Sequence, residues 1–210
     1  MPIRDVLQRL PAGFTLPGAP TSVRWAPPEE VREQQEIEFS WAGETARHVG
    51  TVVHRWLQRI ADEELRGWDA RRIDGLRIRF AEDLKRRGVS SSELDTAATR
   101  VASALEGTLA DKRGRWLLGP QTDSRTEYRM RTPGSVTYIV DRSFRDSEDR
   151  LWIVDWKTSR HEGRDIEAFL DQEQVRYAPQ LERYAAVVGA TRIGLYFPAL
   201  SRWREWIRGN

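Results

Sequence analysis

Several features are missing from this 210-residue sequence, and each absence excludes a class of protein. The chain has no cysteine, so disulfides, thiolate zinc sites and iron–sulfur clusters are excluded. It has no run of about 18 apolar residues, so the sequence predicts no membrane span. The first residues, MPIRDVLQRLP, lack the apolar segment of a signal peptide. We therefore expect a cytosolic protein of the bacterial type, with no membrane partner.

Lysine is also scarce. Of the 34 basic residues, 31 are arginine and three are lysine. One of the three, Lys157, lies in the strand-like run LWIVDWKTS, at residues 151–159. An ammonium is a compact point charge, whereas a guanidinium is bulkier and always charged. The presence of lysine at this position therefore indicates a need for a compact positive charge, and the surrounding residues suggest its role.

The chain divides into a leader and one domain. Six of the ten prolines lie within residues 1–28, so the sequence predicts an extended leader or linker over residues 1–36. Residues 37–210 then form a single domain, with a possible short strand at 37–43. Its helical part spans 44–118 and its α/β core spans 125–210.

Apolar spacing predicts three helices in the first part of this domain. The first begins at Glu44 and is closed by Gly67, and the second covers about 69–87. Residues 90–93, SSSE, are a plausible capping box for a third helix that continues to about Asp111. Glycines at 114 and 119 then end the helical block.

The period changes to that of strands after residue 120. Residues 125–131 alternate, and residues 135–145 and 150–157 read as two strands of a hairpin with its turn at 146–149. A long helix over about 165–188 and a strand at 192–197 complete a β-α-β unit. The sequence thus predicts an α/β fold with a central mixed sheet, flanking helices and a helical N-terminal half.

Two aspartates and the unusual lysine meet on this hairpin. A turn at 146–149 places Asp141 opposite Val154 or Asp155, and alternation places Lys157 on the same face as Asp155. Adjacent carboxylates repel each other, and a divalent cation such as Mg²⁺ or Mn²⁺ removes that repulsion. Lys157 would then hold a water or offset charge on a phosphate. An ordinary hairpin with a cross-strand Asp–Lys ion pair is the alternative.

The wider pattern resembles the RecB-family nuclease domains of the PD-(D/E)xK superfamily, as found at the C-terminus of UvrD-like or AddA-type DNA helicases. The matching motifs occur in family order over about residues 40–200. They are GTVVHRWL at 50–57, TEYRM at 126–130, YIVD at 138–141, IVDWKTS at 153–159 and YAPQLERY at 177–184.

The resemblance implies a metal-dependent deoxyribonuclease, most simply an exonuclease of a recombination or repair complex. His54, Asp141 and Asp155 would bind Mg²⁺, with Mn²⁺ as a substitute, and the backbone carbonyl of Trp156 would be a further ligand. Lys157 would position the attacking water and the scissile phosphate. A histidine beside an apolar helical stripe can also be an ordinary packed residue.

The resemblance also implies roles outside the metal ligands. Glu127 would lie near the metal or support its ligands. Gln180 and Tyr184 would contact the DNA backbone or brace the site, and Tyr177 could equally belong to the core. Related domains usually have glycine where this chain has Tyr138, and a large side chain there would narrow the approach of DNA.

Two further functions stay open beside a nuclease. The chain has no G-x-x-x-x-G-K-[ST] phosphate loop, so it is not a helicase motor. The resemblance implies a motor domain or subunit as its partner. A catalytically inactive, nuclease-like DNA-binding or scaffolding module is the first alternative, and a purely structural interaction domain is the second.

Overall fold

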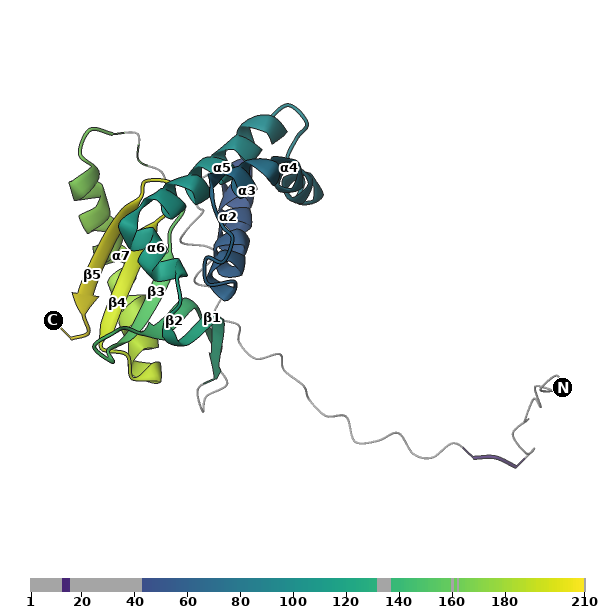
Figure 1. Cartoon of the computed structure of the whole chain (residues 1–210). Helices are drawn as coiled ribbons and strands as arrows, with labels where there is room; N and C mark the ends of the chain where they lie inside the picture. Colours follow the sequence, from purple (N-terminus) through teal and green to yellow (C-terminus); the bar gives the residue numbers. More distant parts are fainter. Residues whose placement is uncertain (1–12, 16–42, 132–136, 160, 162, 210) are drawn as a thin grey trace.

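The computed structural model describes residues 13–15, 43–131, 137–159, 161 and 163–209 (Figure 1). The predicted leader and the possible strand at 37–43 lie almost wholly outside the described residues. The helices are α2 (Glu44–Asp62), α3 (Ala70–Gly75), α4 (Arg77–Arg86), α5 (Leu94–Ala110), α6 (Lys112–Leu118) and α7 (Ile166–Val188). The strands are β1 (Thr122–Arg131), β2 (Thr137–Arg145), β3 (Leu151–Trp156), β4 (Arg192–Phe197) and β5 (Arg202–Ile207). No described helix is long and apolar enough to cross a membrane.

The five strands form one mixed sheet in the order β1-β2-β3-β4-β5. Neighbouring strands are antiparallel except β3 and β4, which are parallel and joined by the crossover helix α7. The predicted α/β architecture, with a hairpin followed by a β-α-β unit, is confirmed. Gly189 ends α7 in the left-handed conformation, at φ 75°, which glycine adopts without steric cost.

Two apolar clusters hold the layers together, one on each face of the sheet. The cluster under α2–α6 includes Trp56, Phe144 and Trp156. The cluster under α7 includes Ile153 and Leu181. In Figure 1, α7 accordingly lies on the face of the sheet opposite α6. Alternate residues of β3 therefore enter different cores, which explains why LWIVDW is almost continuously apolar.

The helical half differs from the prediction in four places. The first helix, α2, ends at Asp62 and not at Gly67. The second predicted helix is two helices, α3 and α4, separated at Leu76. The predicted capping box does not cap α5, because the Ser90 hydroxyl donates to the Glu93 carboxylate, 2.8 Å away, rather than accepting a backbone N–H. Gly114 does not end the helical block. It lies inside α6, whose first turn is capped by the Asp111 carboxylate accepting the Gly114 N–H at 2.9 Å.

Strand β5 was not predicted. Its sequence, RWREWI, mixes arginine, tryptophan and glutamate without strict alternation of apolar and polar residues. It is recruited by packing instead. Gly194 of β4 leaves room for the Trp203 ring of β5, which would lie only 1.9 Å from a Cβ at that position. The fifth strand therefore depends on a tertiary contact rather than on its own pattern.

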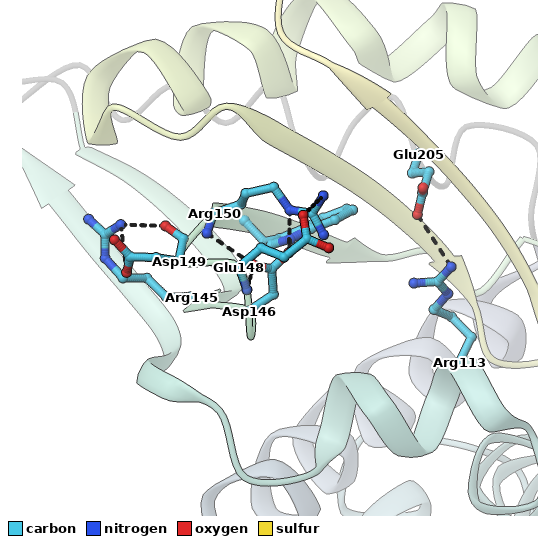
Figure 2. A network of polar contacts seen from close by, with 8 residues as sticks. Arg113, Arg145, Asp146, Glu148, Asp149, Arg150 and Glu205 are labelled. Carbon is cyan, nitrogen blue, oxygen red and sulfur yellow. Dashed lines mark hydrogen bonds and ion pairs between the residues drawn. The ribbon is translucent and has the colours of Figure 1, made fainter.

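The β2–β3 turn is fixed by one buried carboxylate, that of Asp146 (Figure 2). Its Oδ2 accepts the Trp152 indole N–H and the Arg150 Nε–H, both at 2.7 Å. Its Oδ1 accepts the backbone N–H groups of Glu148 at 2.9 Å and Arg150 at 3.0 Å. Burial alone would raise the pKa of Asp146, but these hydrogen bonds outweigh it and lower the pKa to about 2.

Candidate metal and phosphate site

The β2–β3 hairpin opens at the end opposite its turn. The last backbone pair there is Arg142 with Val154, so the next two residues in register are Asp141 and Asp155. Of the two registers predicted, the structure therefore has the one that places the aspartates opposite each other. The Asp141 side chain also accepts the Trp156 N–H, at 2.8 Å from Oδ2. The Asp141 carboxylate thus accepts a backbone hydrogen bond at the point where the pairing of the two strands ends.

Asp155 and Lys157 lie together on the α7 face of β3. The Lys157 Nζ is 2.9 Å from Asp155 Oδ2, and each side chain is almost completely buried. Val154 and Trp156 enter the opposite core, as the alternation of the strand predicts. Removing both charges from water is costly, so this buried ion pair is weak evidence for a contribution to the stability of the fold. It does place an ammonium immediately beside Asp155.

His54 of α2 lies beside one of these carboxylates, that of Asp141. Val53 and Leu57 turn into the core, which leaves His54 partly exposed at the side of the helix. Its Nδ1 is 3.5 Å from Asp141 Oδ2. Burial acts to raise the pKa of Asp141, but the His54 charge, its hydrogen bond and the Trp156 N–H together hold that pKa below its usual range. Asp141 is therefore stabilised as a carboxylate.

Glu127 occupies a strained position opposite Asp141. Pairing of Thr126 with Arg142 and of Tyr128 with Val140 places Glu127 across from that aspartate. Residues 126 and 128 would point to the same face of a regular strand. Here the Thr126 hydroxyl donates to Asp62 of α2, whereas Tyr128 packs in the cluster under α7, so the strand changes face at Glu127. Glu127 itself has φ 42° and an exposed side chain.

The backbone conformation of Glu127 costs on the order of 1–3 kcal/mol for a residue other than glycine. Such strain persists only where the surrounding structure imposes it, and it concentrates at functional sites. In the described residues, Glu127 does not belong to any group of three or more acidic or histidine side chains that could hold a metal ion. Its predicted place near a metal stays a prediction.

Helix α7 covers the site with the three residues of its predicted motif. The buried Tyr177 ring lies 3.9 Å from Lys157 Nζ, measured to the ring centroid. The Gln180 amide donates to the Tyr184 hydroxyl at 2.9 Å. The Tyr184 ring packs against Tyr138 of β2, with centroids 4.9 Å apart. The motif therefore makes contacts within the protein, and Tyr177 belongs both to the core and to the surroundings of the lysine.

Comparison with known proteins places this arrangement in a family. A family model described as the PD-(D/E)XK nuclease superfamily matches residues 30–202. The chain belongs to the PD-(D/E)XK nuclease superfamily. Members of this superfamily are generally nucleases and typically use divalent metal ions. A search of curated proteins found no match.

Within this PD-(D/E)XK fold, the donor atoms present suit a hard divalent cation. Two aspartates adjoin at the open end of the hairpin, and an imidazole is in contact with one of them. Carboxylate oxygens are the ligands that Mg²⁺ prefers, and imidazole suits Mn²⁺ better than Mg²⁺. In the residues the structure describes, no three acidic or histidine side chains converge on one point. The donor atoms fit a divalent cation in chemical kind, and in this structure the side chains are paired with their protein neighbours.

Two buried polar residues of the site were missed by the sequence analysis. Ser159 continues the alternation of Asp155 and Lys157 beyond the end of β3, and its hydroxyl donates to Glu173 Oε2 at 2.8 Å. Glu173 lies one helical turn before Tyr177 on α7 and is 5% exposed. The alternation could have indicated Ser159. Glu173 had no signal, because its neighbours are known only once α7 is placed on the sheet.

Proposed function

We propose that the chain is a metal-dependent deoxyribonuclease that hydrolyses phosphodiester bonds. The observation that carries the proposal is the placement of Asp141 and Asp155 just beyond the last backbone pair at the open end of the hairpin. Lys157 Nζ lies 2.9 Å from Asp155, and His54 Nδ1 lies 3.5 Å from Asp141. A cluster of charge in a largely buried place is costly to maintain. A catalytic site for an anionic substrate accounts for all four residues at once.

Four groups would hold the metal: the Asp141 and Asp155 carboxylates, the His54 imidazole and the backbone carbonyl of Trp156. A bound divalent ion would supply a water of lowered pKa and polarise the phosphate. Mg²⁺ is the expected ion, and Mn²⁺ is a plausible substitute because of the histidine. Asp141 is suited to this role because its low pKa keeps it ionised.

Lys157 would act on the reacting groups. Its ammonium would orient the attacking water and offset the negative charge that develops on the phosphate oxygens. The water would attack phosphorus in line with the departing oxygen, so the P–O bond breaks without a covalent enzyme intermediate. Glu127 would support the metal from β1. Gln180 and Tyr184 would contact the DNA backbone or brace the site.

The resemblance to RecB-family domains extends this proposal to a biological setting. We propose an exonuclease domain that acts in DNA recombination or repair, fed by a helicase motor in another domain or subunit. The motif order supports a helicase partner, because it is the order found in RecB-family domains. The sequence has no phosphate loop, so the motor would have to be in another domain or subunit. The motor would deliver the strand, and this domain would cut it.

The test is degradation of labelled linear single-stranded DNA in Mg²⁺, Mn²⁺ or EDTA. We expect cleavage that requires metal and falls by about 100-fold or more in Lys157→Ala. Lys112→Ala is the matched control, because Lys112 is an exposed lysine of α6. Equal activity of the wild-type protein and Lys157→Ala would contradict the proposed site.

A catalytically inactive, DNA-binding module is the second candidate, and Tyr138 favours it. This tyrosine packs on Tyr184 beside the site, where a larger side chain can obstruct a strand of DNA. In that case the wild-type protein binds DNA but does not cut it with either metal. Tyr138→Gly would then be the variant that distinguishes an obstructed nuclease, which gains activity, from a scaffold, which does not.

A further inference from the structure

One face of helix α7 contacts the two side chains that point toward it around the end of β3, those of Lys157 and Ser159. Lys157 and Ser159 both point from the end of β3 toward this helix. Tyr177 lies against Lys157, and Glu173, one turn earlier on the helix, binds Ser159. Successive residues of one helix face therefore meet successive residues of one strand face. This register is available only because α7 crosses directly from β3 to β4.

The Tyr177 ring gives the Lys157 ammonium a definite place. A cation lies favourably over an aromatic face, and the interaction strengthens when both groups are removed from water. Lys157 Nζ is 3.9 Å from the ring centroid and 2.9 Å from Asp155 Oδ2. The ring and the carboxylate together limit where the flexible four-carbon side chain can put its charge.

The Glu173–Ser159 hydrogen bond restrains the segment that follows Lys157. Both side chains are at least nine-tenths buried. A buried carboxylate requires donors, and Glu173 receives one from Ser159 at 2.8 Å while Arg176 NH1 lies 3.4 Å from its other oxygen. The chain leaves the sheet just after Lys157, whose backbone N–H still donates to Tyr196 of β4. Through its hydrogen bond with Ser159, Glu173 thus restrains the first residues after the end of β3.

We propose that Tyr177 and Glu173 are positioning residues for Lys157. Tyr177 orients the ammonium through its ring, and Glu173 fixes the backbone beyond the lysine through Ser159. The proposal rests on the proposed function, because Lys157 is the group that would act on the water and the phosphate. Placing that ammonium wrongly by about 1 Å can cost about 100-fold in rate.

The first experiment observes Lys157 directly and does not require activity. The chain has three lysines, so lysine-labelled protein gives three side-chain signals by NMR. Lys85 and Lys112 are exposed and serve as internal references. The Lys157 signal is identified by its loss in Lys157→Gln. Because it lies over an aromatic face, its ε-methylene protons should be displaced upfield from those of the other two.

Four variants test the two positioning contacts. Tyr177→Leu should abolish the upfield displacement, and Tyr177→Phe should keep it, since the ring is retained. Glu173→Ala should move or broaden the Lys157 signal. Glu173→Gln should restore it, because the amide oxygen can still accept the Ser159 hydroxyl. A Lys157 signal that is the same in Glu173→Ala as in the wild-type protein overturns the role of Glu173.

The second experiment measures kcat and DNA affinity separately. We expect kcat to fall by about 10- to 100-fold in Tyr177→Leu and Glu173→Ala. Their Kd for a DNA oligonucleotide in EDTA should be unchanged, and Tyr177→Phe and Glu173→Gln should regain most of the rate. Leu170→Val is the matched control, because it loosens the apolar packing of α7 and keeps both the Tyr177 ring and the Glu173 carboxylate. It should lower the melting temperature and leave kcat unchanged.

The outcomes separate this proposal from the proposed function. If the wild-type protein does not cleave but the NMR results are as expected, the nuclease function is overturned and the placement of Lys157 is supported. If the wild-type protein cleaves while Glu173→Ala and Tyr177→Leu retain its kcat, the positioning proposal is wrong and the nuclease stands. Equal loss of kcat in Leu170→Val would also overturn it, since general loosening would then explain the effect.

Discussion

The two ends of the β2–β3 hairpin hold aspartates in opposite surroundings. At the turn, Asp146 accepts four hydrogen bonds from two side chains and two backbone N–H groups (Figure 2). At the open end, Asp141 and Asp155 lie opposite each other, with one lysine and one histidine close by. The Asp146 carboxylate is surrounded by hydrogen-bond donors, whereas Asp141 and Asp155 have fewer donors around them.

This difference teaches how to separate a structural carboxylate from a functional one. Surrounding a buried charge with donors stabilises it and leaves no room for a ligand. Placing two carboxylates together raises the energy of the protein unless a cation joins them. Burial alone does not distinguish the two ends, because Asp146 and Asp155 are both buried. The neighbours of each carboxylate make the distinction, and each prediction below tests it.

The largest expected effect is on activity at the open end. Asp141→Asn and Asp155→Asn should each lower kcat by about 1,000-fold, because a lost metal ligand removes several kcal/mol of stabilisation from the transition state. Asp146→Asn, the same change at the turn, should stay within about threefold of the wild-type rate. Steady-state cleavage of labelled DNA measures all three. Comparable losses at both ends would break the comparison.

The next effect is on stability at the turn. Asp146→Ala leaves the buried Trp152 indole N–H without its acceptor and removes the partner of Arg150. We expect the free energy of unfolding to fall by about 2–4 kcal/mol, measured by urea denaturation. Asp141→Asn at the open end should lose less, because Asp141 is partly exposed and the change relieves its repulsion from Asp155. A larger loss for Asp141→Asn than for Asp146→Ala would show that the open end is the structural one.

A smaller effect concerns acid stability. The pKa of Asp146 is lowered to about 2 from an ordinary value of 3.8, so its contribution is complete above pH 4 and is lost as the pH falls toward 2. The contribution should be on the order of 1–2 kcal/mol, allowing for screening at a turn near solvent. Unfolding measured at several pH values should show this step in the wild-type protein. The same step in Asp146→Asn would assign it to another group.

The smallest expected effect lies between the two ends, at Arg142. This guanidinium is fully buried and donates to the Gly119 carbonyl at 3.0 Å, while its Nε and NH1 have no hydrogen-bond partner in the described residues. Burial lowers the pKa of Arg142 to about 10, although nearby Asp62 opposes that shift. Arg142→Met should therefore leave the free energy of unfolding within about 1 kcal/mol of the wild-type value. A loss above about 2 kcal/mol in thermal or urea unfolding would show that the buried charge is well compensated.

Sequence alone was sufficient where a local pattern has one physical solution. The period-two run ending at Lys157 and the turn residues after Arg145 specify the hairpin, and the position of the turn limits its register to two that differ by one residue. Gly189 and the apolar spacing before it specify α7 and its end. Scarcity of lysine drew attention to Lys157, because a single ammonium among arginines is unusual.

Sequence was insufficient where a residue's role depends on a distant partner. Strand β5 exists because Trp203 packs on Gly194, and Gly114 continues a helix because Asp111 caps it. Glu127 has strand-like neighbours in sequence, yet its backbone is left-handed where the strand changes face. Local propensity carries none of this information, since each outcome is decided by contacts made after the elements assemble.

The sequence by itself determined the hairpin and the crossover helix, because period and turn chemistry are local properties. It also indicated the candidate residues His54, Asp141, Asp155 and Lys157, because the order of motifs can be read along the chain. Only the tertiary structure decided which carboxylate is surrounded by donors and which faces another carboxylate. It also decided that Tyr177 and Glu173 lie against the segment of Lys157. The physical reason is that the energy of a buried charge depends on its neighbours in space, and the chain order does not specify them.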